Sequence, residues 1–130
     1  MALAALDREL LVGIDLEHLS HGRPGFETVA FTDEERELVA SLAQDARREW
    51  LLRLWCAKEA AAKALGRGMS AMNALAVTRA ETETGLVRME LRNGLSSEFP
   101  RLRGRQMTAY TARENDFVYS AIAEKQGDPQ

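Results

Sequence analysis

The sequence contains only one cysteine, Cys56, so no disulfide can form within the chain. A chain without disulfides suits a reducing compartment. No apolar run approaches the roughly 20 residues that a membrane-spanning helix needs. The opening stretch, "MALAALDREL", carries acidic residues early and lacks the basic segment of a secretory signal. We therefore expect a cytoplasmic protein that does not enter a membrane.

Neither sign of charge is in large excess. The 17 lysines and arginines stand against 20 acidic residues, which gives a formal net charge of −3. This balance offers no global basic surface and argues against binding to nucleic acid or to an acidic membrane. A phosphate-cradling loop of the P-loop form is also missing, because "GRG" at 66–68 is too short for one.

The 130 residues, 45% of them hydrophobic, suit one domain that spans 1–130. We expect 1–8 to be a linker and 124–130 to be a disordered tail. The apolar periodicity and the positions of Gly and Pro predict one strand, a loop over 18–25, two helices and then four strands. The expected strands are 9–17, 75–81, 85–92, 106–112 and 117–123, and the expected helices are 31–44 and 47–65. Helices grouped against a mainly antiparallel sheet define an α+β fold.

Two acidic residues lie close together near the end of the first predicted strand. Asp15 and Glu17 are two residues apart, so their side chains leave the same face of the strand. Like charges placed in this way repel each other. Either the strand ends there and both groups are solvated, or a cation lies between them. Carboxylate oxygens suit Mg²⁺, which commonly takes one or two carboxylates together with waters and substrate phosphates.

The alanine-rich stretch "WCAKEAAAK", 55–63, mounts three charges on a predicted helix. Lys58, Glu59 and Lys63 form either a solvated face with an ordinary Glu59–Lys63 pair or part of a functional site. In the second case Glu59 adds a third carboxylate, and the lysines are suitable partners for phosphate. Three acids and two lysines can hold Mg²⁺ and a diphosphate together, which is what phosphoryl-type transfer requires. We interpret Cys56 as a small buried residue.

Three segments of the chain resemble the signature segments of the 4′-phosphopantetheinyl transferases. They are "VGIDLE" at 12–17, "FTDEE" at 31–35 and "WCAKEAAAKALGRG" at 55–68, in the order and at the spacing of that family. The resemblance implies the family's α+β fold, a mainly antiparallel sheet packed against a long helix plus shorter helices. It also implies an enzyme of the holo-[acyl-carrier-protein] synthase type that acts in polyketide or fatty acid biosynthesis. Such an enzyme moves the 4′-phosphopantetheine arm of coenzyme A to a serine of an acyl or peptidyl carrier protein and releases adenosine 3′,5′-bisphosphate.

The resemblance also implies a role for each matching residue. Asp15, Glu17 and Glu59 would bind Mg²⁺. Glu59 would help to deprotonate the incoming serine, directly or through a metal-bound water. Lys63 would bind the diphosphate of coenzyme A and stabilise the charge that develops on it. Lys58 would contact the phosphate region or pair with a ligand carboxylate.

Two further matches keep a structural interpretation beside the functional one. Glu35 matches the glutamate of the second segment, but Thr32 three residues earlier gives the spacing of a helix capping box. Trp55 matches the aromatic residue of the third segment, and we expect it in the core.

The chain departs from the family pattern in its coenzyme A site. It has the length of the short members, which form trimers, whereas its Asp15-x-Glu17 pair resembles the second half of long, Sfp-type members. The Ser-His pair that short members carry near their last strands is missing. The remaining contacts would come from another copy of the chain, with a trimer favoured, from a missing half in a larger synthase, or from a basic loop. The candidate residues of that loop, which can equally be a solvated segment, are Arg101, Arg103 and Arg105.

The alternative function is a non-catalytic domain that docks carrier proteins. Three converging acids argue against it, because docking alone has no physical need for them. We expect carrier recognition on a local apolar and basic patch near 66–72.

Overall fold

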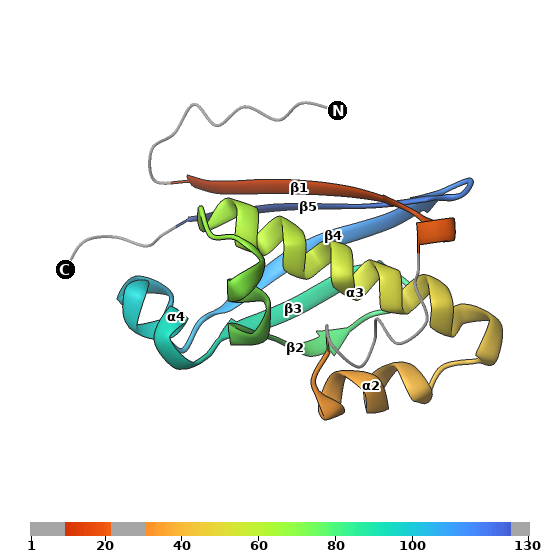
Figure 1. The fold of residues 1–130 in the computed structure, drawn as a ribbon, viewed down its shortest axis with the longest axis horizontal. Coiled ribbons are helices and arrows are strands. Elements are labelled where there is room, and N and C mark those ends of the chain that lie inside the picture. The colour runs from red at the N-terminus through yellow and green to blue at the C-terminus, as the bar shows by residue number, and fades with distance from the viewer. Residues whose placement is uncertain (1–9, 22–30, 126–130) are drawn as a thin grey trace.

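The computed structural model describes residues 10–21 and 31–125 (Figure 1). The predicted linker, 22–25 of the predicted loop and the last five residues of the predicted tail lie outside this description. A five-stranded antiparallel sheet forms one layer, and the long helix α3 (Gln44–Ala64) crosses one of its faces. The predicted α+β class is therefore confirmed. Among the described residues, no helix combines the length and the apolar character that crossing a bilayer would require.

The strands lie in the order β1-β5-β4-β3-β2, and each pairs antiparallel with its neighbours. They are β1 (Leu10–His18), β2 (Leu75–Ala80), β3 (Leu86–Leu91), β4 (Gln106–Glu114) and β5 (Phe117–Lys125). All five agree with the predicted strands to within two residues at each end. β5 runs through Glu124 and Lys125, which we had assigned to the tail, because Lys125 still pairs with Leu10.

Helix α2 (Asp33–Ala40) begins at the predicted capping box. The Thr32 hydroxyl accepts from the Glu35 amide at 3.2 Å, and the Glu35 carboxylate accepts from the Thr32 amide at 2.8 Å. The helix ends four residues earlier than predicted, and α3 begins at Gln44 rather than 47. The short helix α4 (Asn93–Glu98) and the 3₁₀ turns η1 (Leu19–His21), η2 (Met69–Ala74) and η3 (Pro100–Leu102) were not predicted. Each is too short to show a helical period in the sequence.

The close approach of α3 to β1 depends on small residues on both sides. Ala57, Ala60 and Ala61 of α3 are fully buried. Opposite them lies Gly13, where a Cβ atom would sit 2.0 Å from the carbonyl oxygen of Ala60 and 2.8 Å from the amide nitrogen of Ala64. No side chain fits in that space, so the strand and the helix come closer than ordinary strand–helix packing would allow.

The face of the sheet that is turned away from α3, here called the outer face, carries exposed apolar residues. Leu16 is 59% exposed and Tyr110 is 64% exposed, and Phe117 is exposed as well. Their neighbours along each strand point toward α3. The register places Tyr110, Ala121 and Ile14 in one row across β4, β5 and β1. Apolar residues grouped on an exposed face are typical of a contact surface.

We predict that Gly13→Ala destabilises the fold by about 2–3 kcal/mol, at the upper end of the cost of overpacking. The new methyl group would meet backbone atoms, which cannot move aside as a flexible side chain can. The free energy of unfolding in urea measures the effect. Gly94→Ala is the control, because a Cβ atom at Gly94 would meet nothing within 4 Å. Equal stability of the two variants would contradict the packing argument.

Candidate active site

Three carboxylates meet where β1 passes α3. Asp15 and Glu17 come from β1, and Glu59 comes from the start of the last third of α3. One oxygen of each can be chosen so that the three lie within 4.8 Å of one another. Asp15 is buried, whereas Glu17 and Glu59 are half-buried. The structure thus brings together the three acids that the sequence pattern selected as metal ligands.

Lys63 lies beside this cluster and pairs across to the strand. Its Nζ atom donates to Asp15 Oδ1 at 2.9 Å, and its side chain remains half-exposed. The hydrogen bond to Asp15 is the main reason why the pKa of Lys63 is raised. Among the described residues, the salt-bridge partner of Lys63 is therefore Asp15 rather than Glu59 one turn earlier in the same helix. The simple solvated pair that the sequence allowed is not what the structure shows.

The site holds more negative than positive charge. Burial raises the pKa of Glu59, and the charges of Asp15 and Glu17 raise it further, while Lys63 lowers it. Glu59 is therefore a stronger base than an ordinary surface glutamate. Burial also raises the pKa of the Cys56 thiol, followed by the charge of Asp15, and its Sγ atom donates to the carbonyl oxygen of Val118. Cys56 is thus a protonated, buried residue, as expected.

The chemistry of the cluster fits a divalent cation. All three side chains offer hard carboxylate oxygens, which Mg²⁺ prefers over nitrogen or sulfur. Asp15 Oδ2 is buried and accepts no hydrogen bond among the described residues. A buried carboxylate oxygen without a donor is costly, and a cation is one way to satisfy it. The residues present therefore fit the ion that the sequence pattern predicts.

Lys58 does not join this cluster. Its Nζ atom is buried and donates to the two carboxylate oxygens of Glu35 at 3.0 and 3.3 Å. We had expected Lys58 to contact the phosphate region or to pair with one of the metal-ligand carboxylates, but its salt-bridge partner is Glu35, which lies outside the cluster. The reason is helical geometry, because successive residues such as Lys58 and Glu59 point about 100° apart around α3.

Glu35, the partner of Lys58, has a structural role. Its carboxylate is fully buried and also accepts from the amide of Val77 at 2.7 Å. Together with the capping box, these bonds tie the start of α2 to α3 and to β2. The structure therefore favours the structural interpretation of Glu35 over a catalytic one.

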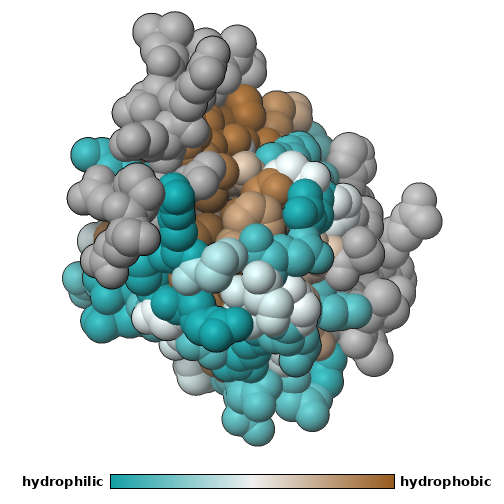
Figure 2. Space-filling view, turned by 90° about the vertical axis from the view of Figure 1, so that its left-hand side faces the viewer, coloured by the Kyte–Doolittle hydropathy of each residue, from teal (hydrophilic) through white to brown (hydrophobic). Residues whose placement is uncertain are grey.

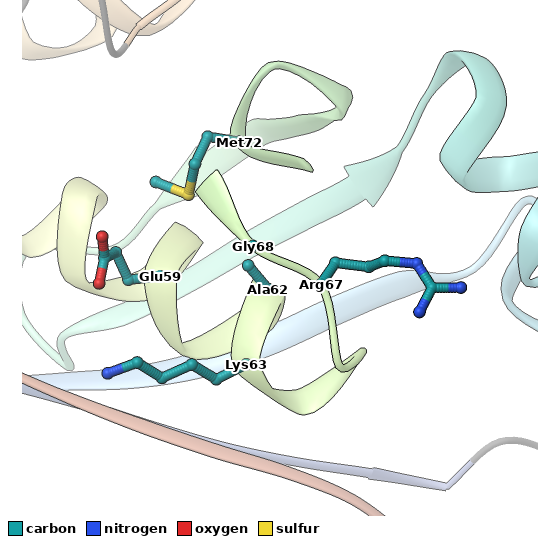
Figure 3. A pocket seen from close by; sticks show the side chains of 6 residues that line it. All are labelled: Glu59, Ala62, Lys63, Arg67, Gly68 and Met72. Atoms are coloured by element: carbon teal, nitrogen blue, oxygen red, sulfur yellow. The ribbon is translucent and has the colours of Figure 1, made fainter. Parts of the chain in front are cut away.

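A cavity of about 140 Å³ opens next to Glu59 and Lys63 (Figure 3). Its walls are largely apolar, and its lining residues are Glu59, Ala62, Lys63, Arg67, Gly68 and Met72. The polar ends of Glu59 and Lys63 point to the same side, whereas the guanidinium of Arg67 points away from them. That guanidinium pairs with Glu98 of α4. The cavity overlaps 66–72, where the sequence predicted a patch for carrier proteins.

The three arginines predicted as substitute phosphate contacts are exposed. Arg105 donates to the carbonyl oxygen of Lys125 at the end of β5. Arg101 belongs to η3 and Arg103 follows it. Their role in binding coenzyme A remains a prediction.

The sequence analysis missed Ser120. This residue lies on β5 directly opposite Asp15, and its hydroxyl is buried without a hydrogen-bond partner among the described residues. Nothing in the order of residues marks it, because only the register of β1 against β5 brings it to the carboxylate cluster.

Comparisons with known proteins all indicate the same family. The sequence model of the 4′-phosphopantetheinyl transferase superfamily matches residues 11–118. The chain is 34% identical over 88 residues to 4′-phosphopantetheinyl transferase HetI of a Nostoc species, and this match covers 64% of the chain. It spans only 36% of HetI.

Two solved structures are similar in fold. Holo-[acyl-carrier-protein] synthase of Neisseria meningitidis superimposes with a TM-score of 0.68 and 20% identity, over 88% of this chain and 97% of that one. The ACPS–CoA complex of Chronobacterium ammoniagenes superimposes with a TM-score of 0.68 and 20% identity, over 89% and 96%.

We predict that Lys58→Met lowers the free energy of unfolding by about 3–5 kcal/mol, because it leaves the Glu35 carboxylate buried without its cation. Urea denaturation measures the change. The control is Arg79→Met, which removes an exposed partner of Glu81 and should cost no more than about 0.5 kcal/mol. A loss below that of the control would show that the Lys58–Glu35 pair does not stabilise the fold.

A second prediction concerns pH in the absence of divalent cations. The folded chain raises the pKa of Glu59 above its ordinary 4.5, so folding favours the protonated form. The stability of the wild-type chain should therefore fall, relative to Glu59→Gln, as the pH rises from 4.5 through the raised pKa. Urea midpoints in EDTA across this range test the sign. Glu90→Gln, which removes an exposed carboxylate outside the cluster, should show no such trend.

Proposed function

The chain belongs to the 4′-phosphopantetheinyl transferase superfamily, and we propose that it transfers the 4′-phosphopantetheine arm of coenzyme A to a serine of an acyl or peptidyl carrier protein. The other product is adenosine 3′,5′-bisphosphate. The observation that carries this proposal is the meeting of three carboxylates with Lys63 beside an apolar cavity. This arrangement suits the binding of a metal and a diphosphate, and the cavity suits a small uncharged group next to them.

Asp15, Glu17 and Glu59 are the residues that would hold Mg²⁺. When bound, the ion neutralises charge on the diphosphate and orients it. The remaining work falls to side chains of this chain. Lys63 is half-exposed and ends at Asp15, so it can exchange this partner for a diphosphate oxygen without leaving its place on α3.

Glu59 is the proposed general base. Its carboxylate lies beside Lys63 at the cavity, where a serine hydroxyl could approach it directly or through a water. The serine oxygen then forms a bond to the β-phosphorus of coenzyme A, and the bond from that phosphorus to the bridging oxygen breaks. The negative charge leaves with adenosine 3′,5′-bisphosphate, and Lys63 offsets part of it.

We propose that a second polypeptide completes the coenzyme A site. The Ser-His pair of short family members is missing from the sequence, and the chain spans about a third of HetI. The outer face offers a surface for such a contact, since Leu16 and Tyr110 are exposed there. Figure 2 also shows apolar surface at the end of the molecule where β1 begins and α3 ends, above a more hydrophilic region. Either a homo-oligomer, with a trimer favoured, or a separate half could supply the remaining coenzyme A contacts.

The proposed setting is the cytoplasm, and the carrier would belong to polyketide or fatty acid biosynthesis. A carrier-docking domain without catalysis is the second candidate, and the missing Ser-His pair is the observation that favours it. A docking function does not account for the carboxylate cluster, because docking does not require three acids that repel one another.

The direct test is to incubate the chain with coenzyme A, Mg²⁺ and a panel of apo carrier proteins, and to weigh the carriers by intact mass spectrometry. We expect a gain of one phosphopantetheine mass that EDTA abolishes. Glu59→Gln should lower the rate by at least about 100-fold, the usual minimum contribution of a general base, while carrier binding persists. Glu90→Gln is the matched control and should leave the rate unchanged.

Two outcomes would count against the proposal. An unchanged rate in Glu59→Gln would remove Glu59 as the base. A folded chain that binds carriers but neither transfers the arm nor binds coenzyme A in calorimetry would favour the docking domain, whereas coenzyme A binding without transfer would point to a missing half.

A further inference from the structure

Two buried polar atoms of the described chain have no hydrogen-bond partner, and they belong to residues that face each other. They are Asp15 Oδ2 and Ser120 Oγ. Asp15 and Ser120 are direct partners in the antiparallel ladder of β1 and β5. Buried polar groups are nearly always satisfied in folded proteins, so a coincidence of two on opposed residues calls for a physical reason.

The two side chains lie on the same face of the sheet and within reach of each other. Directly opposed residues in an antiparallel pair have Cβ atoms about 4.5–5.5 Å apart. Ser120 is 1% exposed and Asp15 is 7% exposed, so water has little access to either. A rotation of the serine hydroxyl about its Cα–Cβ bond can therefore bring Oγ to Asp15 Oδ2 without moving the backbone.

The other neighbours of Ser120 do not need its proton. Across β4 its partner is Thr111, whose own hydroxyl donates to the carbonyl oxygen of Gly85 at 2.6 Å. The same Thr111 oxygen already accepts from Arg53. Asp15 is in the opposite position, because Lys63 occupies Oδ1 while Oδ2 accepts no hydrogen bond of ordinary geometry among the described residues. The Cys56 thiol and Glu59 lie close enough to interact with this carboxylate, but each is a donor only when it is protonated. A cation at the cluster would keep Glu59 ionised, so the Ser120 hydroxyl is then a suitable donor for Oδ2.

We propose that Ser120 is a positioning residue for Asp15. With Mg²⁺ held by the cluster, its hydroxyl would turn to donate to Oδ2 and so keep the Asp15 carboxylate in one orientation. Partners of this kind behind a metal ligand commonly change metal affinity 10-fold to 100-fold when they are removed. The inference rests on the proposed function in one respect, namely that the carboxylate cluster binds Mg²⁺.

The test compares Ser120→Ala with wild type in two measurements. The first is the melting temperature in EDTA, and the second is Mg²⁺ affinity, from calorimetric titration with Mg²⁺ alone. We expect a nearly unchanged melting temperature in EDTA, because the Ser120 hydroxyl has no hydrogen-bond partner among the described residues that the substitution would remove. We expect the dissociation constant of Mg²⁺ to rise about tenfold. Ser120→Thr keeps the hydroxyl and should restore the wild-type affinity.

Thr111→Val is the matched control on the adjacent strand. It removes a buried hydroxyl that makes two hydrogen bonds and touches no carboxylate of the cluster, so it should lower the melting temperature and leave Mg²⁺ affinity unchanged. If Ser120→Ala also lowers only the melting temperature, Ser120 is structural and the inference is wrong. If wild type itself shows no Mg²⁺ binding, the proposed metal site fails, and the inference fails with it for that separate reason.

Discussion

The contact between Gly13 of β1 and the backbone of α3 is the constraint on which the rest of the structure depends. A methyl group there would overlap the Ala60 carbonyl oxygen, so the strand can lie against the helix only because it has no side chain at that point. Asp15 follows two residues later on the same face, and Glu59 precedes Ala60 on the helix. The close packing thus sets the distance between carboxylates from two elements that are 44 residues apart in sequence, as the difference between 59 and 15 shows.

Two lysines of the same helix meet two different needs. Lys58 is buried on Glu35, which is itself bonded to the amides of Thr32 and Val77, so this pair fixes how α3 is rotated against α2 and β2. Because the rotation is fixed, Glu59 is directed toward β1. Lys63 is half-exposed and bonded only at its tip, so it can exchange partners. Lys58, in a fully buried pair, fixes the position of the helix, whereas Lys63, five residues later, is half-exposed and can reach a ligand.

Local patterns predicted much of the fold, because apolar runs bounded by Gly, Pro and polar residues marked all five strands, and the spacing of Thr32 and Glu35 marked the start of α2. The carboxylate cluster joins residues far apart in the sequence, and its prediction rested mainly on the resemblance to the three signature segments. The salt-bridge partner of Lys58 could not be predicted from local patterns, since it depends on which side of α3 faces Glu35. Ser120 was missed for a similar reason: it meets Asp15 only because β1 pairs with β5 from the other end of the chain, and no neighbouring residue signals that register. The sequence alone does not indicate which surfaces of the helices and strands contact each other.

The position of β1 is consistent with the proposal that a second polypeptide completes the site. This nine-residue strand carries two of the three carboxylates and, within the described part of the chain, lies at the edge of the sheet with β5 as its neighbour. An edge strand presents unpaired backbone groups, and an apolar edge is prone to bind another chain. The row of Ile14, Ala121 and Tyr110 extends this surface onto the outer face. The edge that carries the acids is therefore continuous with the exposed apolar surface, so one contact with a second polypeptide, as proposed, could both cover the apolar residues and add coenzyme A contacts beside the carboxylates.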